Sequence, residues 1–292
     1  MRVESVSGRD RVVMSRPSVA SYGAMEERRE TALVTGASAG IGAAIARELA
    51  RRGYDLVLTA RRAERLNELA AELESEYGSR TTVIPGDLAR PETPASIVAA
   101  LEDRGLEVDM LVNNAGYGVT GAYLSRDWQT HEAFLQVMVR AVAELTWRLT
   151  GPMRARGHGR VINLASLAGL LPGAGGHTLY GAVKAWMVSF TESLAFELEE
   201  HGVTVTAVCP GFTYTEFHDV NQMREQVSQL PEYMWMSAEK VAVQALDAAE
   251  NGKKVWVNGR FNRFLAWLTR HLPRSVVYRM MLKRARSLRN TN

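Results

Sequence analysis

The sequence has little of several features that would assign it to other classes of protein. A single cysteine, Cys209, excludes an internal disulfide framework and suits a reducing compartment, so we expect a cytoplasmic protein and a buried Cys209. The six histidines are scattered without ligand-type spacing, and we expect no metal site. No apolar run is long enough to cross a bilayer. A net charge of +3 is too small to indicate a nucleic-acid partner.

The first 29 residues differ in composition from the rest of the chain. They are rich in Arg, Ser, Glu and Val, show no periodicity, and lack the apolar stretch of a secretory signal. We expect residues 1–29 to form a disordered extension, with a regulatory segment as the alternative.

From residue 31 onward, short runs rich in Val, Leu and Ile alternate with longer segments of helical spacing. This alternation predicts an α/β fold with one doubly wound parallel sheet of about seven strands and helices on both faces. We expect a single domain over residues 30–259. The runs are 31–36, 55–60, 81–87, 109–116, 159–166, 203–211 and 253–259, and the clearest helical segments are 41–52, 62–77, 128–156 and 179–201.

The segment TGASAGIG follows the first of these runs and opens the first helix. Gly36 permits a tight turn, Gly40 lets the backbone approach a pyrophosphate, and Gly42 lets helix and strand pack closely. The free N–H groups of the helix N-terminus favour a phosphate. At this place in an alternating chain, the three glycines predict a dinucleotide site.

The GxxxGxG spacing, the NNAG segment at 113–116 and YGAVK at 180–184 together resemble the short-chain dehydrogenase/reductase family. The resemblance covers residues 31–259 and implies a Rossmann-type fold, an oxidoreductase, and a homodimer or homotetramer with the Tyr180-bearing helix at one interface. The apolar Trp186, Phe190 and Phe196 are compatible with that interface. The cofactor-binding residues that it implies are Gly36, Ser38, Gly40, Ile41, Gly42, Arg61, Asp87, Leu88, Asn114, Ala115, Gly116, Tyr180, Lys184, Pro210, Gly211, Thr213 and Thr215.

The end of the second strand indicates which nicotinamide cofactor is bound. An NAD-preferring protein usually has an acidic residue here, but this sequence has Ala60 followed by Arg61 and Arg62. A guanidinium can hold the 2′-phosphate of NADP in a bidentate pair, and the Ser38 hydroxyl can add a donor. We therefore expect NADP(H) rather than NAD(H). A solvated helix start is the alternative role for the arginines.

Tyr180 and Lys184 lie four positions apart, so they share one face of a helix. The resemblance places that face beside the nicotinamide. A free tyrosine has a pKa of about 10, and a nearby ammonium together with the oxidised nicotinamide would lower it. Tyr180 is then the general acid for carbonyl reduction or the base for alcohol oxidation. Lys184 would also bind the nicotinamide ribose, and Ser166 would polarise the substrate oxygen.

Two departures from the family bear on the catalytic residues. Ser166 and Tyr180 are fourteen positions apart, one more than usual, and the glycine-rich loop at 172–177 can absorb the extra residue. The family commonly has an asparagine, which supports a proton path to the lysine, where this sequence has Met138. A thioether cannot replace an amide as donor. Three consequences of Met138 are therefore open. The proton relay is routed through other water, turnover is slow, or the protein is a cofactor-binding sensor or scaffold without turnover.

Two segments are expected around the substrate. Residues 216–240 carry an apolar set that predicts either a pocket wall for a hydrophobic carbonyl or alcohol or ordinary core packing. Residues 260–292 form a basic, amphipathic helical tail without an acidic residue. It packs within the protein or against a sister subunit, or it makes peripheral contact with a membrane. The apolar set is Phe217, Met223, Leu230, Tyr233, Met234, Trp235 and Met236.

Overall fold

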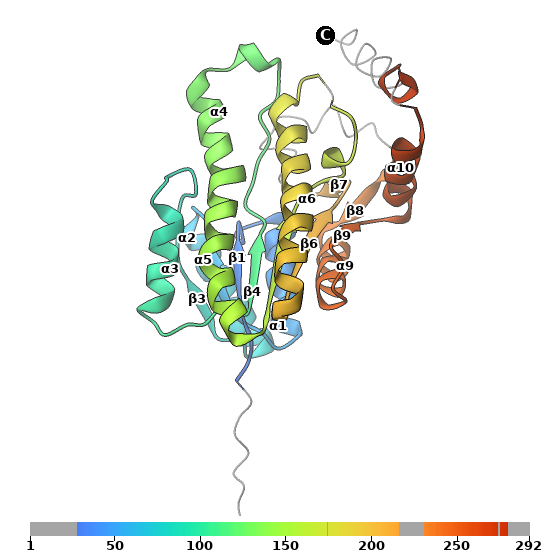
Figure 1. The fold of residues 1–292 in the computed structure, drawn as a ribbon. Coiled ribbons are helices and arrows are strands. Elements are labelled where there is room, and N and C mark those ends of the chain that lie inside the picture. Colours follow the sequence, from blue (N-terminus) through green and yellow to red (C-terminus); the bar gives the residue numbers. More distant parts are fainter. Residues whose placement is uncertain (1–27, 174, 216–230, 274, 280–292) are drawn as a thin grey trace, which may run out of the picture.

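The fold is taken from a computed structural model, which describes residues 28–173, 175–215, 231–273 and 275–279 (Figure 1). Its centre is a seven-stranded parallel sheet, and each predicted strand run contributes one strand. The strands follow one another across the sheet as β3 (Thr81–Val83), β2 (Asp55–Thr59), β1 (Thr31–Thr35), β4 (Met110–Asn113), β5 (Gly159–Leu164), β6 (Val203–Cys209) and β9 (Val255–Val257). The strand order reverses between β1 and β4, which is the switch point where ligands collect in such sheets.

Helices cover both faces of the sheet (Figure 1). One face is covered by α1 (Gly40–Arg51), α2 (Ala63–Tyr77) and α9 (Ala238–Glu250). The other face is covered by α3 (Thr93–Glu102), α5 (Ala141–Arg156) and α6 (Thr178–Leu198). The helix α4 (Trp128–Leu135) continues into α5 through a π-helical segment, Gln136–Arg140. The predicted α/β fold is thereby confirmed.

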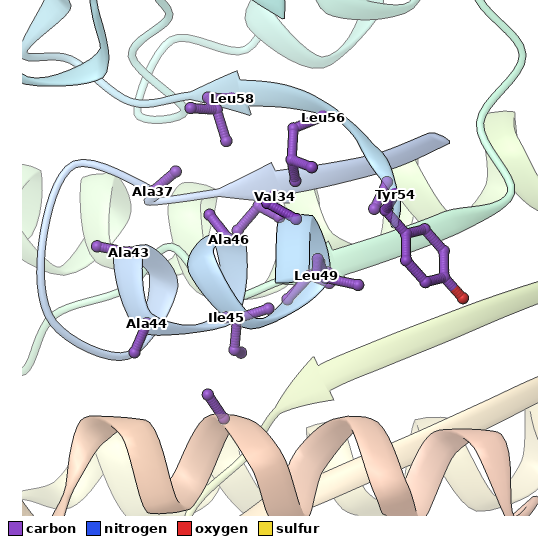
Figure 2. Packing of buried hydrophobic residues seen from close by; sticks show 14 of the residues in the cluster. Val34, Ala37, Ala43, Ala44, Ile45, Ala46, Leu49, Tyr54, Leu56 and Leu58 are labelled. Carbon is purple, nitrogen blue, oxygen red and sulfur yellow. The ribbon is translucent and has the colours of Figure 1, made fainter. Parts of the chain in front are cut away.

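Successive side chains of β1 point to opposite faces of the sheet, so this strand contributes to both hydrophobic clusters. Ala32 and Val34 join the cluster under α1, whereas Leu33 joins the cluster on the other face. Figure 2 shows Ala46 of α1 pointing toward Val34, so a small side chain lies between that helix and the sheet. Each fully buried Leu or Ile in such a cluster contributes about 1.5–3 kcal/mol. Both faces of the sheet are therefore covered by apolar side chains, and a binding site can form only at the ends of the strands.

Several short elements complete the described chain. The predictions had not included a second, two-stranded parallel sheet, in which β7 (Phe212–Tyr214) pairs with β8 (Trp235–Ser237). The helix α10 (Arg260–His271) begins the tail, beyond the carboxyl end of β9 (Figure 1). The 3₁₀ turns are η1 (Tyr123–Ser125), η3 (Leu167–Gly169), η4 (Glu199–His201) and η5 (Glu232–Met234).

Some expectations lie outside the described residues. They are those for residues 1–27, for the end of the tail from residue 280, and for Phe217, Met223 and Leu230. Arg28, which is described, pairs with buried Asp109 at 2.8 Å. In the described ranges, no helix combines the length and apolarity that crossing a bilayer requires.

Candidate active site

A cavity of about 770 Å³ opens at the carboxyl ends of the strands. It brings together all of the predicted site residues except Gly42, which lies beneath the turn that the cavity exposes. The cavity is therefore continuous from the glycine turn to Tyr180. The predicted residues on its wall are Gly36, Ser38, Gly40, Ile41, Arg61, Asp87, Leu88, Asn114, Ala115, Gly116, Ser166, Tyr180, Lys184, Pro210, Gly211, Thr213 and Thr215.

The glycine turn between β1 and α1 has room for a phosphate because side chains are excluded from it. Gly36 and Gly40 have φ angles of 67° and 57°, which favour glycine. A Cβ on Gly42 would lie 2.4 Å from the Gly36 carbonyl oxygen. The N-cap residue of α1 is Ala39, whose side chain offers no acceptor to the N–H groups of the first turn. This cradle fits a dinucleotide pyrophosphate.

The NNAG segment is held at the switch point by the hydroxyl of Thr35, a residue that the sequence analysis did not single out. Its Oγ1 accepts hydrogen bonds from the backbone N–H groups of Asn114 at 2.9 Å and Ala115 at 3.0 Å, and it donates to the Val112 carbonyl at 3.1 Å. The Asn114 side chain donates back to the Thr35 carbonyl at 2.9 Å. Thr35 and Asn114 thus join the ends of β1 and β4.

Arg62, like Arg61, reaches the cavity wall beyond β2. Its Nη2 and Nε atoms lie 3.1 and 3.3 Å from the Ser38 hydroxyl. The turn that bears Ser38 and the start of α2 therefore meet at one point. Two exposed guanidinium groups and a hydroxyl can together surround an anion at the cavity rim.

Tyr180 and Lys184 project from α6 into the same cavity, and Ser166 faces them from the end of β5. The Lys184 Nζ atom lies 5.8 Å from the Tyr180 ring centroid and donates a hydrogen bond to the Leu164 carbonyl. Gly169 lets this arrangement form, because a Cβ there would lie 2.6 Å from the Lys184 backbone. The turn that follows Ser166 is thus packed directly on α6.

Burial is the largest cause of the pKa shifts of both Tyr180 and Lys184. Burial raises the pKa of Tyr180, and a hydrogen bond with Ser166 opposes the rise only in part. Burial lowers the pKa of Lys184 to about 8, while the nearby Cys209 opposes this fall. Ser166, rather than Lys184, is the group that opposes the rise in the Tyr180 pKa, and the expected lowering by the ammonium together with the oxidised nicotinamide stays a prediction for the protein with its cofactor.

Cys209 is fully buried, as predicted, at the end of β6 beside this cluster. Burial raises the pKa of its thiol to about 12. A neutral thiol of this kind is a poor nucleophile. Cys209 therefore serves as a small core residue under the site.

Met138 lies in the π-helical segment and is fully buried on the cavity side. A Cβ on Gly116 would lie 2.7 Å from the Met138 sulfur, so the thioether packs directly against the NNAG segment. Gln136 is also buried, in the same segment. Met138 thus fills with apolar atoms the position where the family commonly has an amide.

The strand end after β6 carries the remaining predicted residues. Thr213 is buried, and its hydroxyl donates to the Gly211 carbonyl at 3.2 Å. Thr215 reaches back to the glycine turn, since a Cβ on Gly40 would lie 3.2 Å from its methyl group. A Cβ on Gly211 would lie 2.5 Å from the Asn262 side chain of α10. The start of the tail therefore packs directly on this turn.

The substrate end of the cavity is lined by residues that motif analysis could not find, because they belong to loops without a fixed pattern. They include Leu171, Pro172 and His177, which precede Tyr180. Burial lowers the pKa of His177, so its imidazole is neutral at pH 7. The cavity lining does not include the described members of the apolar set that was expected as a pocket wall or as core packing, which are Tyr233, Met234, Trp235 and Met236. Trp235 of β8 stacks on Tyr214 at 4.6 Å.

A doubly wound sheet with a glycine turn at its switch point defines a class of dinucleotide-binding proteins, and comparisons with known proteins narrow this class to a family. A family model described as short chain dehydrogenase matches residues 30–226. Nodulation protein G of Rhizobium sp. (strain N33) is 38% identical over 240 residues, covering 78% of this chain and 95% of that protein. The chain therefore belongs to the short-chain dehydrogenase family and is an oxidoreductase.

Two solved structures agree with this assignment. The short-chain dehydrogenase from Sphingobium yanoikuyae in complex with NADPH has a TM-score of 0.73 at 30% identity, covering 90% of this chain and 95% of that chain. The bulky-bulky ketone specific alcohol dehydrogenase from Comamonas testosteroni has a TM-score of 0.70 at 28% identity, covering 89% and 94%. The similarity thus extends over nearly the whole length of both structures.

Proposed function

We propose that the protein is an NADP(H)-dependent oxidoreductase that interconverts a carbonyl and an alcohol on a hydrophobic substrate. The observation that carries this proposal is the single cavity that joins the glycine turn, the arginine pair and the Ser166–Tyr180–Lys184 cluster. The NADPH in the similar Sphingobium structure supports the cofactor, and the bulky ketone specificity of the Comamonas enzyme supports the substrate class.

The cofactor would lie along this cavity, with its pyrophosphate on the glycine turn. Arg61, Arg62 and Ser38 would hold the 2′-phosphate. Lys184 would bind the nicotinamide ribose, and Gly211 and Thr213 would flank the nicotinamide. When bound, the nicotinamide supplies or accepts the hydride.

Tyr180, Ser166 and Lys184 would handle the proton. The raised pKa of Tyr180 keeps the phenol protonated at pH 7, which suits a general acid for carbonyl reduction. Its Oη proton would pass to the carbonyl oxygen, and the Ser166 hydroxyl would hydrogen-bond that same oxygen. Lys184, with a pKa of about 8, remains largely protonated and favours the phenolate that is left.

A substrate screen tests this proposal. Purified protein would be offered apolar and polar ketones and aldehydes, with NADPH or NADH in parallel, and cofactor consumption would be followed by absorbance at saturating carbonyl. We expect consumption with NADPH and an apolar carbonyl. Binding of NADPH without reduction of any member of a broad panel would contradict the reaction, and equal use of NADH would contradict the cofactor preference.

We also propose that α6 contributes to a homodimer or homotetramer interface. Phe196 on α6 is 68% exposed, and Trp147 on the neighbouring α5 is 74% exposed. Trp186 and Phe190 stack on each other at 5.1 Å along α6. Sedimentation equilibrium of the wild type and of Phe196→Glu tests this, with a smaller mass expected for the variant. A monomeric wild type would contradict it.

A further inference from the structure

The helix α10 is fixed to the protein by one face and leaves aromatic side chains on the other. On the inner face, Asn262 is buried and donates to the Asn258 carbonyl at 2.8 Å, and Phe261 packs edge-on against Tyr233 at 5.1 Å. On the outer face, Phe264 and Trp267 are 56% and 55% exposed, and their rings lie 6.2 Å apart. A held helix thus presents a continuous aromatic surface to solvent.

The same outer face carries positive charge that no acidic group of the described residues offsets. Arg260, Arg263 and Arg270 are exposed, and among the described residues no carboxylate lies within salt-bridge distance of them. Arg263 instead lies over the Trp256 ring at 5.3 Å. From residue 260 to 292 the sequence contains nine Lys and Arg and no Asp or Glu. The charge is therefore free to meet an external anionic partner.

Two other exposed aromatic residues of the described chain, Trp147 and Phe196, have different surroundings. Trp147 stands beside Arg148, whose charge is paired with Glu144 at 2.9 Å. Phe196 lies under Lys254, which is paired with a glutamate, also at 2.9 Å. At these two aromatic sites the neighbouring cation has a carboxylate partner. On the outer face of α10 the exposed rings lie beside arginines that have no carboxylate partner among the described residues.

We propose that α10 binds peripherally to the surface of an anionic lipid bilayer. Arg260, Arg263 and Arg270 meet the phosphate groups, while Phe264 and Trp267 enter the boundary between headgroups and acyl chains. A second copy of the chain, docked face to face on α10, would bring like charges together. A nucleic acid would pair with the arginines but offers no apolar layer for the rings. The proposal does not depend on the reaction, because binding is measured without turnover.

Vesicle sedimentation with the full-length protein tests the proposal. The vesicles are phosphatidylcholine alone or phosphatidylcholine mixed with phosphatidylglycerol, each at low and high salt. We expect binding to the anionic vesicles, weaker at high salt because salt screens the arginines. Arg260→Gln with Arg270→Gln should weaken binding by about 25-fold, since each cation near such a surface contributes about fivefold. Phe264→Ala with Trp267→Ala should weaken it at both salt concentrations.

Matched variants control for general effects. Arg104→Gln with Arg154→Gln removes the same charge elsewhere, and Trp128→Ala removes an indole of similar exposure (57%) elsewhere; both should bind as the wild type does. Folding is checked for every variant by circular dichroism and NADPH binding. Failure of the folded wild type to sediment, equal binding to both vesicle types, or a change in oligomeric state in the α10 variants without vesicle binding would each overturn the proposal.

Discussion

The two ends of the sheet carry opposite kinds of chemistry, although the same strands run between them. At the carboxyl ends, glycines, hydroxyls and the buried Lys184 surround a cavity. At the amino ends, ion pairs close the surface: Glu30 contacts His158 at 2.7 Å and Arg160 at 2.8 Å. Arg52 binds three carboxylates, those of Glu48, Asp247 and Glu250, at 2.7–2.8 Å.

The difference shows how the fold separates binding from stability. Groups at the amino ends satisfy one another, so they contribute to folding and have little capacity left for a ligand. Groups at the carboxyl ends are held by backbone contacts, as Lys184 is by Leu164, and face open space. Variants at the two ends should therefore affect turnover and stability separately.

A matched pair of tyrosines gives the largest expected contrast. Tyr180→Phe removes the proposed proton donor and keeps the ring, so kcat should fall by about 100- to 10,000-fold with a small change in melting temperature. Tyr54→Phe removes a hydroxyl at the amino ends, where it hydrogen-bonds Glu30, and should leave kcat unchanged. Steady-state kinetics and thermal melts of both variants test this. Retained activity in Tyr180→Phe would remove the proposed acid.

The arginine pair gives the next largest effect, and it is confined to one cofactor. Arg61→Ala with Arg62→Ala should raise KM for NADPH by about tenfold or more, because charge-assisted hydrogen bonds to a phosphate are lost. KM for NADH should hardly change. Arg104→Ala serves as the control for charge. An equal rise for both cofactors would place the arginines outside 2′-phosphate recognition.

At the amino ends, Glu30→Gln keeps the shape and removes the charge that faces Arg160 and His158. The free energy of unfolding should fall by about 1 kcal/mol, a value reduced for partial exposure to solvent. Urea denaturation measures it, and kcat should be unchanged. A loss of activity without a loss of stability would show that the two ends are coupled.

The Glu30 carboxylate also makes the stability of the protein depend on pH. Burial alone would raise the pKa of Glu30, but hydrogen bonds from Tyr54 and His158 and the charge of Arg160 outweigh it and lower the pKa below 4.5. The contribution of Glu30 to the free energy of unfolding is complete above pH 4.5, which is the pKa of this carboxyl in the unfolded chain. The contribution is lost as the pH falls through the lower pKa of the folded protein. Urea midpoints from pH 6 down to about pH 3 should therefore fall less in Glu30→Gln than in the wild type.

Among the variants at the cavity wall, Met138→Asn should have the smallest effect on turnover. The cavity already brings Tyr180, Lys184 and Ser166 together, so we expect kcat to change within about threefold, as for a proton relay that is routed elsewhere. A large gain from near-zero wild-type activity would instead favour the cofactor-binding sensor or scaffold. Melting curves of the variant check that the buried amide has not disturbed the packing against Gly116.

Sequence reasoning predicted the sheet and most of the cavity wall because those parts follow local rules. The apolar runs around Leu33 and Val205 predict strands buried on both faces, and Gly36 and Gly40 predict a turn at a strand end. Both signals are contiguous in the chain, so no knowledge of distant contacts is needed to read them.

Other features depend on residues far apart in the chain. The pairing of β7 with β8 joins segments that no periodicity links, and each strand has only three residues. The contact between Arg62 and Ser38 depends on how two turns approach each other. The pKa of Tyr180 depends on burial and on the hydrogen bond with Ser166, and both are properties of the folded cavity.

The hydroxyl of Thr35 uses all of its hydrogen-bonding capacity, since it donates once and accepts twice. Valine has nearly the same shape as threonine, yet at position 35 it would leave the Ala115 N–H without this acceptor and the Asn114 N–H with only the Val112 carbonyl at 3.1 Å. Serine, which lacks only the methyl group, would keep all three bonds. At position 35 the hydroxyl oxygen is therefore more important than the branched shape of the side chain, and serine should be a milder replacement than valine.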